Sequence, residues 1–187
     1  MTKSLLLSPL LTEEQCREGV TASDIAAAAT FTSTNRRREY LTWRALLYNH
    51  LQRVVNIDYR NGAPIVVDED INIGVSHTVD MVAVLVSDNP CAVDIERVDR
   101  DVSRVRGRFF TDTARALAVD DRAEGAIWCA RECYYKLRRD KSLALLQDIE
   151  VTELDLEQGK VTVKDSRGMC VTMCVKQTAE HIVVYHI

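Results

Sequence analysis

The chain has 187 residues, of which 47% are hydrophobic and 28% charged, and 24 Lys and Arg against 28 Asp and Glu give a net charge of −4. This composition predicts a globular protein of one domain or two joined halves. Typical nucleic-acid-binding proteins have a strong basic excess, so the net negative charge argues against a nucleic-acid partner. No segment reaches the roughly 18 consecutive apolar residues that cross a bilayer, so no membrane partner is expected.

The first apolar segment, residues 5–11, is the only candidate for a leader peptide. Ser8 and Pro9 interrupt it, Glu13 and Glu14 follow it, and it has no small-residue cleavage site. We therefore expect a cytoplasmic protein whose cysteines remain thiols.

The first half of the chain, residues 1–88, is predicted to contain a strand, two helices and a meander of strands. Ser23 and Asp24 are residues that cap a short helix, and Thr34 and Asn35 are candidates to cap a longer one. Apolar residues at spacings of three and four give the longer helix one core-facing stripe, and Asn61-Gly62 is a turn signal. The expected elements are a strand within 3–11, helices over 23–29 and 36–51, and strands over 65–67, 71–75 and 81–86.

The second half, residues 89–187, begins with the Asn89-Pro90 turn signal and repeats the order of helices followed by strands. Asp112 and Asp121 are expected to cap helices, and Asp121 with Glu124 resembles a capping box. The expected elements are a strand over 91–95, a helix from 121 to about 139, and strands over 149–154, 161–164, 170–175 and 182–187. Two similar α+β halves are thus predicted, a pseudo-repeat without any period of 20–50 residues.

Three carboxylates point to a cation site. Asp94 and Glu96 alternate at the end of an apolar strand and so project from one face, although a solvated strand end would show the same pattern. Glu132 lies in a helix beside Trp128 and Tyr135, where a carboxylate needs a cation or a donor. Together these oxygen ligands suit Mg²⁺.

Two further positions could hold a phosphate. Ser76 and His77 end a strand and can donate to an anion, although an ordinary loop histidine is the alternative. Lys136 is one turn after Glu132, either as an ion pair along the helix or as a cation beside a diphosphate.

Cysteine spacing leaves one alternative open. Two C-x₃-C pairs could hold zinc, although buried free thiols are the simpler interpretation. The pairs are Cys129 with Cys133 and Cys170 with Cys174.

The order of four short motifs resembles the 4′-phosphopantetheinyl transferases, most closely the Sfp-like monomeric type. That group has the patterns G-K-P, S-H, (V/I)-G-(I/V)-D-I-E and W-x-x-K-E-A-x-x-K. The corresponding segments here are Gly62-Ala63-Pro64, Val75-Ser76-His77, Val93-Asp94-Ile95-Glu96 and 128–136. Each motif alone is weak, but their order and spacing together are specific.

The resemblance implies a pseudo-dimeric α+β fold with coenzyme A in the cleft between the halves. It implies Asp94, Glu96 and Glu132 as Mg²⁺ ligands, all of them in the second half. It also implies that residues of both halves contact coenzyme A. In the first half these are Arg44, Gly62, Ala63, Pro64, Ser76 and His77, and beside the metal site they are Asp94 and Lys136.

The implied reaction moves phosphopantetheine from coenzyme A to a serine of an acyl or peptidyl carrier protein and releases 3′,5′-ADP. Glu132 would accept the serine proton, and Lys136 and Arg131 would stabilise developing charge. The internal duplication implies a monomer. Carrier proteins are acidic, and residues 97–108 and 131–141 each have a net charge of +3, either as solvated faces or as a docking surface.

Five positions depart from the family pattern and keep a second hypothesis open. These are Ala63 for Lys, Ala92 for Gly, Arg131 for Lys, Cys133 for Ala, and Ala114 for Glu in the segment beginning at Phe109. A catalytically weak relative that binds coenzyme A or a carrier protein is therefore the alternative. A Mg²⁺-dependent phosphohydrolase is disfavoured, because no additional nucleophile is evident.

Overall fold

The computed structural model describes residues 3–67, 69–100 and 110–187. It divides into two compact units, Met1–Pro90 (unit 1) and Cys91–Ile187 (unit 2), where the sequence predicted a division after residue 88. Residues 101–108 of the basic segment 97–108 lie outside the described residues, and so does Phe109. Three of the arginines of that segment are among them, Arg104, Arg106 and Arg108.

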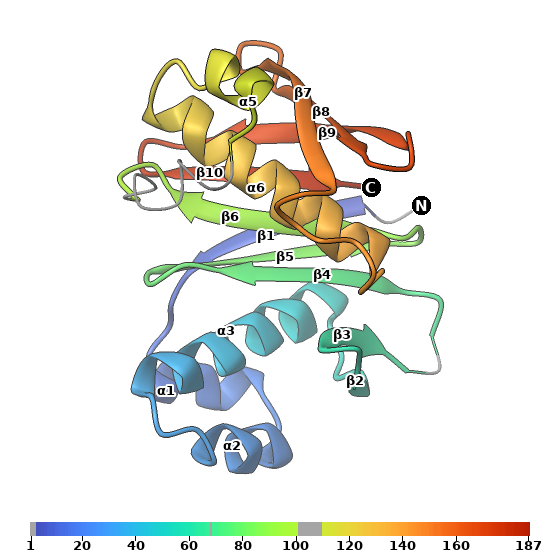
Figure 1. Cartoon of the computed structure of the whole chain (residues 1–187). Coiled ribbons are helices and arrows are strands. Elements are labelled where there is room, and N and C mark those ends of the chain that lie inside the picture. Colours follow the sequence, from blue (N-terminus) through green and yellow to red (C-terminus); the bar gives the residue numbers. More distant parts are fainter. Residues whose placement is uncertain (1–2, 68, 101–109) are drawn as a thin grey trace. The chain divides into compact units, whose positions relative to one another are not determined.

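Unit 1 is built on an antiparallel sheet with the strand order β1-β5-β4. Its strands are β1 (Lys3–Pro9), β4 (Asn72–His77) and β5 (Met81–Ser87). The central strand β5 is almost wholly apolar and buried, as a strand with neighbours on both sides should be. Helix α3 (Thr34–Leu51) packs on this sheet through Trp43 and Leu47 (Figure 1).

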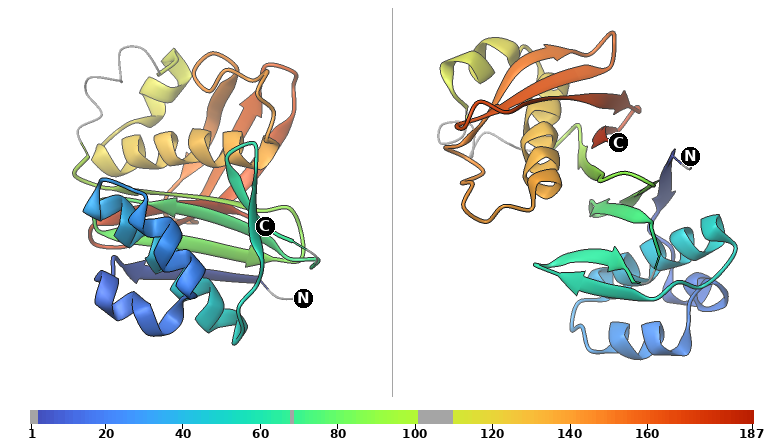
Figure 2. Two further views of the ribbon diagram at one scale, coloured as in Figure 1. Left: turned by 90° about the horizontal axis from the view of Figure 1, so that it is seen from below. Right: turned by 90° about the vertical axis from the view of Figure 1, so that its right-hand side faces the viewer.

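Smaller elements surround α3. Helix α1 (Glu13–Cys16), a 3₁₀ turn (Arg17–Gly19) and α2 (Ala22–Ala29) pack against it on the side away from the sheet (Figure 2). The hairpin of β2 (Ile57–Arg60) and β3 (Ala63–Val66) follows α3. The sequence predicted neither α1 nor β2, because each is only four residues long and has no periodic pattern.

Unit 2 contains a five-stranded antiparallel sheet with the order β6-β10-β9-β8-β7, covered on one face by α6 (Asp121–Arg138). Small and apolar residues of α6, Ala126, Cys129 and Cys133 among them, face the sheet. The short α5 (Asp112–Leu117) lies beside β7 (Figure 1). The strands are β6 (Ala92–Arg97), β7 (Ile149–Asp155), β8 (Lys160–Asp165), β9 (Cys170–Gln177) and β10 (His181–His186).

The two units repeat one topology. In unit 1 the order is β1, α3, then the β4–β5 hairpin, whose second strand pairs with β1. In unit 2 the order is β6, α6, then the β9–β10 hairpin, whose second strand pairs with β6. The long helices α3 and α6 each have 18 residues. The prediction of two similar α+β halves is thereby confirmed.

The helix caps differ by one or two residues from the expected ones. Thr21 caps α2, and Asp24 is the third helical residue that completes its capping box. Ser33 caps α3, and Asp120 caps α6 by accepting from the backbone of Ala123. Neighbouring polar residues compete for each cap, and only the backbone geometry selects one of them.

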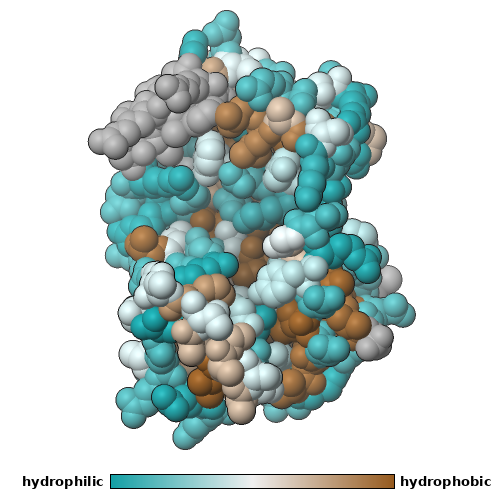
Figure 3. Space-filling model, turned by 60° about the horizontal axis from the view of Figure 1, so that its bottom comes forward, coloured by the Kyte–Doolittle hydropathy of each residue, from teal (hydrophilic) through white to brown (hydrophobic). Residues whose placement is uncertain are grey.

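The face drawn in Figure 3 is mostly hydrophilic, with smaller hydrophobic patches. The large hydrophobic side chains exposed among the described residues come from separate loops, turns and one hairpin strand. They are Val54, Tyr59, Val79, Val119 and Met169. Within the described part of the chain, no helix combines the length and hydropathy that a bilayer crossing requires.

Candidate functional site

The proposed cation ligands of unit 2 come from two elements that pack against each other, β6 and α6. Asp94 is only 4% exposed, and it projects toward α6, as its ion pair with Lys136 shows. Glu96 follows at the i+2 position of the strand, and Glu132 lies on α6 one turn before Lys136. The alternation of the strand and the turn of the helix thus place Asp94 near Lys136 and Glu132. That Glu96 joins Asp94 and Glu132 in one metal site stays a prediction.

A buried ion pair connects the two elements. Lys136 Nζ lies 2.6 Å from Asp94 Oδ1 and 3.4 Å from the carbonyl oxygen of Val93. Burial lowers the pKa of Lys136, but the Asp94 carboxylate outweighs this, so that the pKa is raised. The ammonium group therefore stays charged beside a carboxylate that is shielded from water.

The charged form of Glu132 is disfavoured by its surroundings. Its pKa is raised, first by burial and then by the negative charge of Asp94, while Lys136 and Arg100 act in the opposite direction. Two carboxylates that repel each other in a partly buried place are stabilised by an additional cation.

Arg100 is a cation that the sequence interpretation did not assign to this site. It forms an ion pair with Glu96, and its guanidinium carbon lies 5.4 Å from the ring centroid of Trp128. The only sequence signal is the i,i+4 spacing of Glu96 and Arg100, which indicates a pair on a helix but not after a strand.

The donor chemistry of Asp94, Glu96 and Glu132 fits Mg²⁺, since all three supply carboxylate oxygens. Among residues 3–67, 69–100 and 110–187, however, no three His, Cys, Asp or Glu side chains are grouped closely enough to hold a metal ion as they stand. Asp94 and Glu96 are instead engaged with Lys136 and Arg100. Internal cations therefore take up the charge that a metal would neutralise.

Arg131, which is predicted to stabilise developing charge, contacts the backbone at and just before the start of β7. Its side chain is buried and donates from Nε to the carbonyl oxygen of Ile149 at 2.7 Å and from Nη2 to that of Leu146 at 3.4 Å. Burial lowers its pKa, and the charge of Glu150 opposes this shift. The guanidinium thus holds α6 to the start of β7.

The cysteines of α6 belong to the core. Cys129 and Cys133 are buried, and burial raises the pKa of both thiols, with the nearby Asp94 carboxylate adding to the effect. The Cys129 thiol donates to the carbonyl oxygen of Ile182 at 3.7 Å. Such thiols are poor nucleophiles. Cys170 and Cys174 are exposed on β9.

Unit 1 contains the other predicted positions, and Arg44 on α3 is the most buried of them at 2% exposure. Its Nε lies 2.9 Å from Asp24 Oδ1, and its guanidinium carbon lies 3.5 Å and 4.1 Å from the ring centroids of Tyr40 and Trp43. Stacking and the ion pair together fix this side chain.

A pocket of about 450 Å³ opens beside Arg44. Asp24, Tyr40 and Tyr48 line it together with residues of the loop after α3. The pKa of Tyr48 is raised to about 12, mainly by burial and then by the charge of Asp24. Asp24 therefore provides the negative charge in this pocket, and the sequence interpretation had assigned it only to a helix cap.

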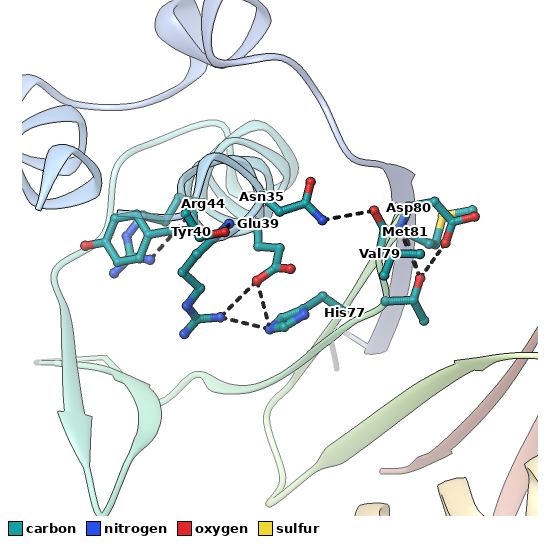
Figure 4. Close-up of polar contacts among 11 residues, drawn as sticks. Asn35, Glu39, Tyr40, Arg44, His77, Val79, Asp80 and Met81 are labelled. Atoms are coloured by element: carbon teal, nitrogen blue, oxygen red, sulfur yellow. Dashed lines mark hydrogen bonds and ion pairs between the residues drawn. The ribbon is translucent and has the colours of Figure 1, made fainter. Parts of the chain in front are cut away.

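His77 and Ser76 lie at the end of β4, with Ser76 buried and His77 exposed. Figure 4 shows the ring of His77 directed toward Glu39 of α3. Arg36 Nη1 lies 2.9 Å from His77 Nε2, and Glu39 Oε2 lies 3.5 Å from the same nitrogen. Arg36 and Glu39 of α3 therefore both contact the ring through the same nitrogen. Arg36, at the start of α3, thus lies beside His77.

Gly62, Ala63 and Pro64 form the turn and first residues of the β2–β3 hairpin. Asn61 and Gly62 have φ angles of 53° and 83°, the left-handed pair that a two-residue hairpin turn of this type requires. Ala63 and Pro64 pair with Arg60 and Tyr59 of β2. The Tyr59 hydroxyl accepts from Arg44 Nη2 at 3.2 Å, which connects the hairpin to the Arg44 pocket.

Comparison with known families gives one match. Residues 90–185 match the model of the 4′-phosphopantetheinyl transferase superfamily. A comparison with curated proteins found no match. The matched range covers about half of the chain and includes β6 and α6 with Asp94, Glu96 and Glu132.

Proposed function

Because the chain belongs to the 4′-phosphopantetheinyl transferase superfamily, we propose that it transfers the 4′-phosphopantetheine group of coenzyme A to a serine of an acyl or peptidyl carrier protein. The products are the modified carrier and 3′,5′-ADP, and the reaction depends on Mg²⁺. One observation supports this most strongly. Within the matched range, Asp94 lies close enough to Glu132 for its charge to raise the pKa of Glu132, and Lys136 of α6 forms an ion pair with Asp94 of β6.

Asp94, Glu96 and Glu132 would hold the Mg²⁺ ion. The ion would supply positive charge to the diphosphate of coenzyme A, where negative charge develops as the leaving phosphate departs. Lys136, whose ammonium stays charged beside Asp94, donates to a diphosphate oxygen.

Glu132 accepts the proton of the serine hydroxyl that attacks the β-phosphorus. A general base works best with a pKa near the working pH, and the pKa of Glu132 is raised toward that range by burial and by Asp94. The bond from serine oxygen to phosphorus forms while the bond to the leaving 3′,5′-ADP breaks. Positioning and electrostatics provide most of the rate in such transfers.

In unit 1 we assign contacts with the nucleotide part of coenzyme A to Arg44, Ser76, His77 and the segment Gly62–Pro64. Arg36 joins this set because it shares a contact with His77. The charge of Arg44 is balanced by Asp24, so its contribution to phosphate binding should be smaller than that of a free guanidinium.

An acidic carrier would contact the basic side chains where α6 ends. Arg138, Arg139 and Lys141 lie in this stretch, and Arg167 joins them through its ion pair with Asp140 at 2.8 Å. Such contacts would accelerate association and weaken with added salt.

A coenzyme A-binding relative without transferase activity is the second candidate. It is favoured by Ala114, where the family pattern has Glu, because this side chain is completely buried and offers no polar group. Asp94, Glu96 and Glu132 favour the transferase.

Intact mass measurement of an apo carrier protein distinguishes the two. The carrier is incubated with this protein, coenzyme A and Mg²⁺, and a parallel sample contains a chelator. A Mg²⁺-dependent gain of one phosphopantetheine supports transfer. Binding of coenzyme A without any gain on fatty-acid, polyketide or peptide carriers supports the second candidate.

A further inference from the structure

Arg100 is held against the carboxylates of unit 2 by the turn that follows β6. The backbone N–H of Arg100 donates to the carbonyl oxygen of Arg97 at 3.2 Å, which closes a four-residue turn. The N–H of Val98 donates to the carbonyl oxygen of Glu180 at 2.8 Å, which ties the same turn to the β9–β10 connection. The chain therefore folds back, and the side chain of Arg100 returns over Glu96.

Two features distinguish Arg100 from an ordinary surface cation. It is paired with Glu96, whose side chain is 17% exposed against 42% for Arg100. Its guanidinium carbon lies 5.4 Å from the ring centroid of Trp128. A planar guanidinium suits both contacts, because it can donate to a carboxylate while lying over an aromatic ring.

The neighbouring Arg97 has a different partner. Its Nε and Nη2 each lie 2.7 Å from one carboxylate oxygen of Asp99, in the two-fold geometry that arginine and carboxylates prefer. In this turn, Arg97 is thus paired with Asp99, and Arg100 is paired with Glu96, a proposed metal ligand.

We propose that Arg100 is a built-in competitor of the divalent cation: its guanidinium occupies Glu96 in the metal-free protein, and metal binding requires its displacement. This inference rests on the proposed function, since it takes Asp94, Glu96 and Glu132 as the metal ligands. Arg100 would then set the metal concentration at which the site fills.

Binding of Mn²⁺ alone, followed by electron paramagnetic resonance of the free ion, tests this in the full chain without coenzyme A. Mn²⁺ accepts the same carboxylate ligands as Mg²⁺. Arg100→Ala should bind Mn²⁺ about three- to fivefold more tightly than the parent chain, the upper part of the range for removing one partly exposed ion pair. Arg97→Ala removes the same charge from the same turn and should change the Kd by less than about twofold.

A fluorescence titration provides a second readout. The chain has two tryptophans, so Trp43→Phe leaves Trp128 as the only reporter. Addition of Mg²⁺ should change Trp128 emission when Arg100 leaves the ring, and Arg100→Ala should abolish most of that change. Arg100→Lys, which keeps the charge but not the planar group, should show an intermediate Kd for Mn²⁺.

Equal, measurable Mn²⁺ affinity of the parent chain and Arg100→Ala would overturn the role of Arg100 and leave the proposed metal ligands intact. Weaker binding by Arg100→Ala would also overturn it, because Arg100 would then support the metal. If neither chain binds Mn²⁺ and Asp94→Ala behaves identically, the ligand assignment of the proposed function fails as well.

Discussion

Individual residues of the site were predictable where local geometry determines them. Strand alternation places Asp94 toward α6, and the helical turn places Glu132 and Lys136 together. Arg131 shows the limit of a motif, because adjacent helical residues point about 100° apart and cannot share the face of Glu132. Arg100 was not predictable, since its contact depends on how a turn folds back.

The Asp94–Lys136 pair should contribute to stability because Asp94 is shielded from water. Lys136→Met removes the partner of that carboxylate and should lower the free energy of unfolding by about 2–3 kcal/mol, measured by urea denaturation with Trp128 fluorescence. Lys141→Met, which removes an exposed lysine from the loop after α6, is the matched control. A loss below about 0.5 kcal/mol, the range of ordinary surface changes, would show that the carboxylate does not need its partner.

Arg131 should act as a structural residue. Arg131→Met leaves the carbonyl oxygens of Ile149 and Leu146 without this donor and should reduce the free energy of unfolding by about 2 kcal/mol. The Mn²⁺ affinity of the folded protein should stay within about twofold of the parent value, since the guanidinium is directed away from the carboxylates. Arg115→Met, an exposed change in α5, controls for loss of charge. A large change in metal affinity would instead indicate that Arg131 contributes to metal binding.

The presence of most helices and strands was predicted more accurately than the residues at which they begin and end. The Asn61-Gly62 pair predicted the turn between β2 and β3, and the long helix α3 followed from its apolar stripe. The short elements α1 and β2 were missed, because four residues show no period. Helix starts moved by a residue or two, since adjacent Thr, Ser and Asp residues can all cap.

The hairpin turn depends on a backbone conformation that glycine adopts freely. Gly62 has φ of 83°, and a Cβ there would meet nothing within 4 Å, so only backbone strain opposes a larger residue. Gly62→Ala should destabilise unit 1 by about 1 kcal/mol in urea unfolding followed by Trp43 fluorescence. Gly62→Asn should be milder, because asparagine tolerates left-handed geometry. Equal stability of Gly62→Ala and the parent chain would contradict the turn assignment.

The β8–β9 connection should make unit 2 sensitive to acid. Burial opposes ionisation of Asp165, but donors from Tyr134, Met169 and Arg167 outweigh it and lower its pKa. The pKa of Asp140 falls to about 2, first through the Ser142 hydroxyl and then through the Ser142 N–H and Arg167. Both folded-state pKa values lie below the ordinary 3.8, so the stabilisation is complete above that pH and is lost as the pH falls toward about 2.

Urea unfolding of unit 2 between pH 5 and about 2.5 checks this dependence, because linkage relates its slope to the protons taken up on unfolding. The parent chain should lose stability across this interval more steeply than Asp165→Asn, which cannot titrate there. Glu157→Gln, an exposed change in the β7–β8 turn, should follow the parent curve. Parallel curves for the parent chain and Asp165→Asn would contradict the assigned pKa shift.

At the scale of the whole molecule, the repeated order of strand, helix and hairpin was predictable from the alternation of helical and β-rich segments. Pairing was not, because the sequence does not state that β5 joins β1 or that β10 joins β6. Net charge was also a poor guide to partners. The total of −4 includes the carboxylates that we propose to be neutralised by metal, while basic side chains gather at the end of α6.

The central claim is that the carboxylates between β6 and α6 perform phosphopantetheine transfer. The most direct test is the rate of mass gain on an apo carrier protein with Mg²⁺ and coenzyme A, for the parent chain and Asp94→Ala at matched folded concentrations. The parent chain should modify the carrier, and Asp94→Ala should be slower by about 100-fold or more, as expected for loss of a group that stabilises the transition state. Undiminished transfer by Asp94→Ala would contradict the assignment.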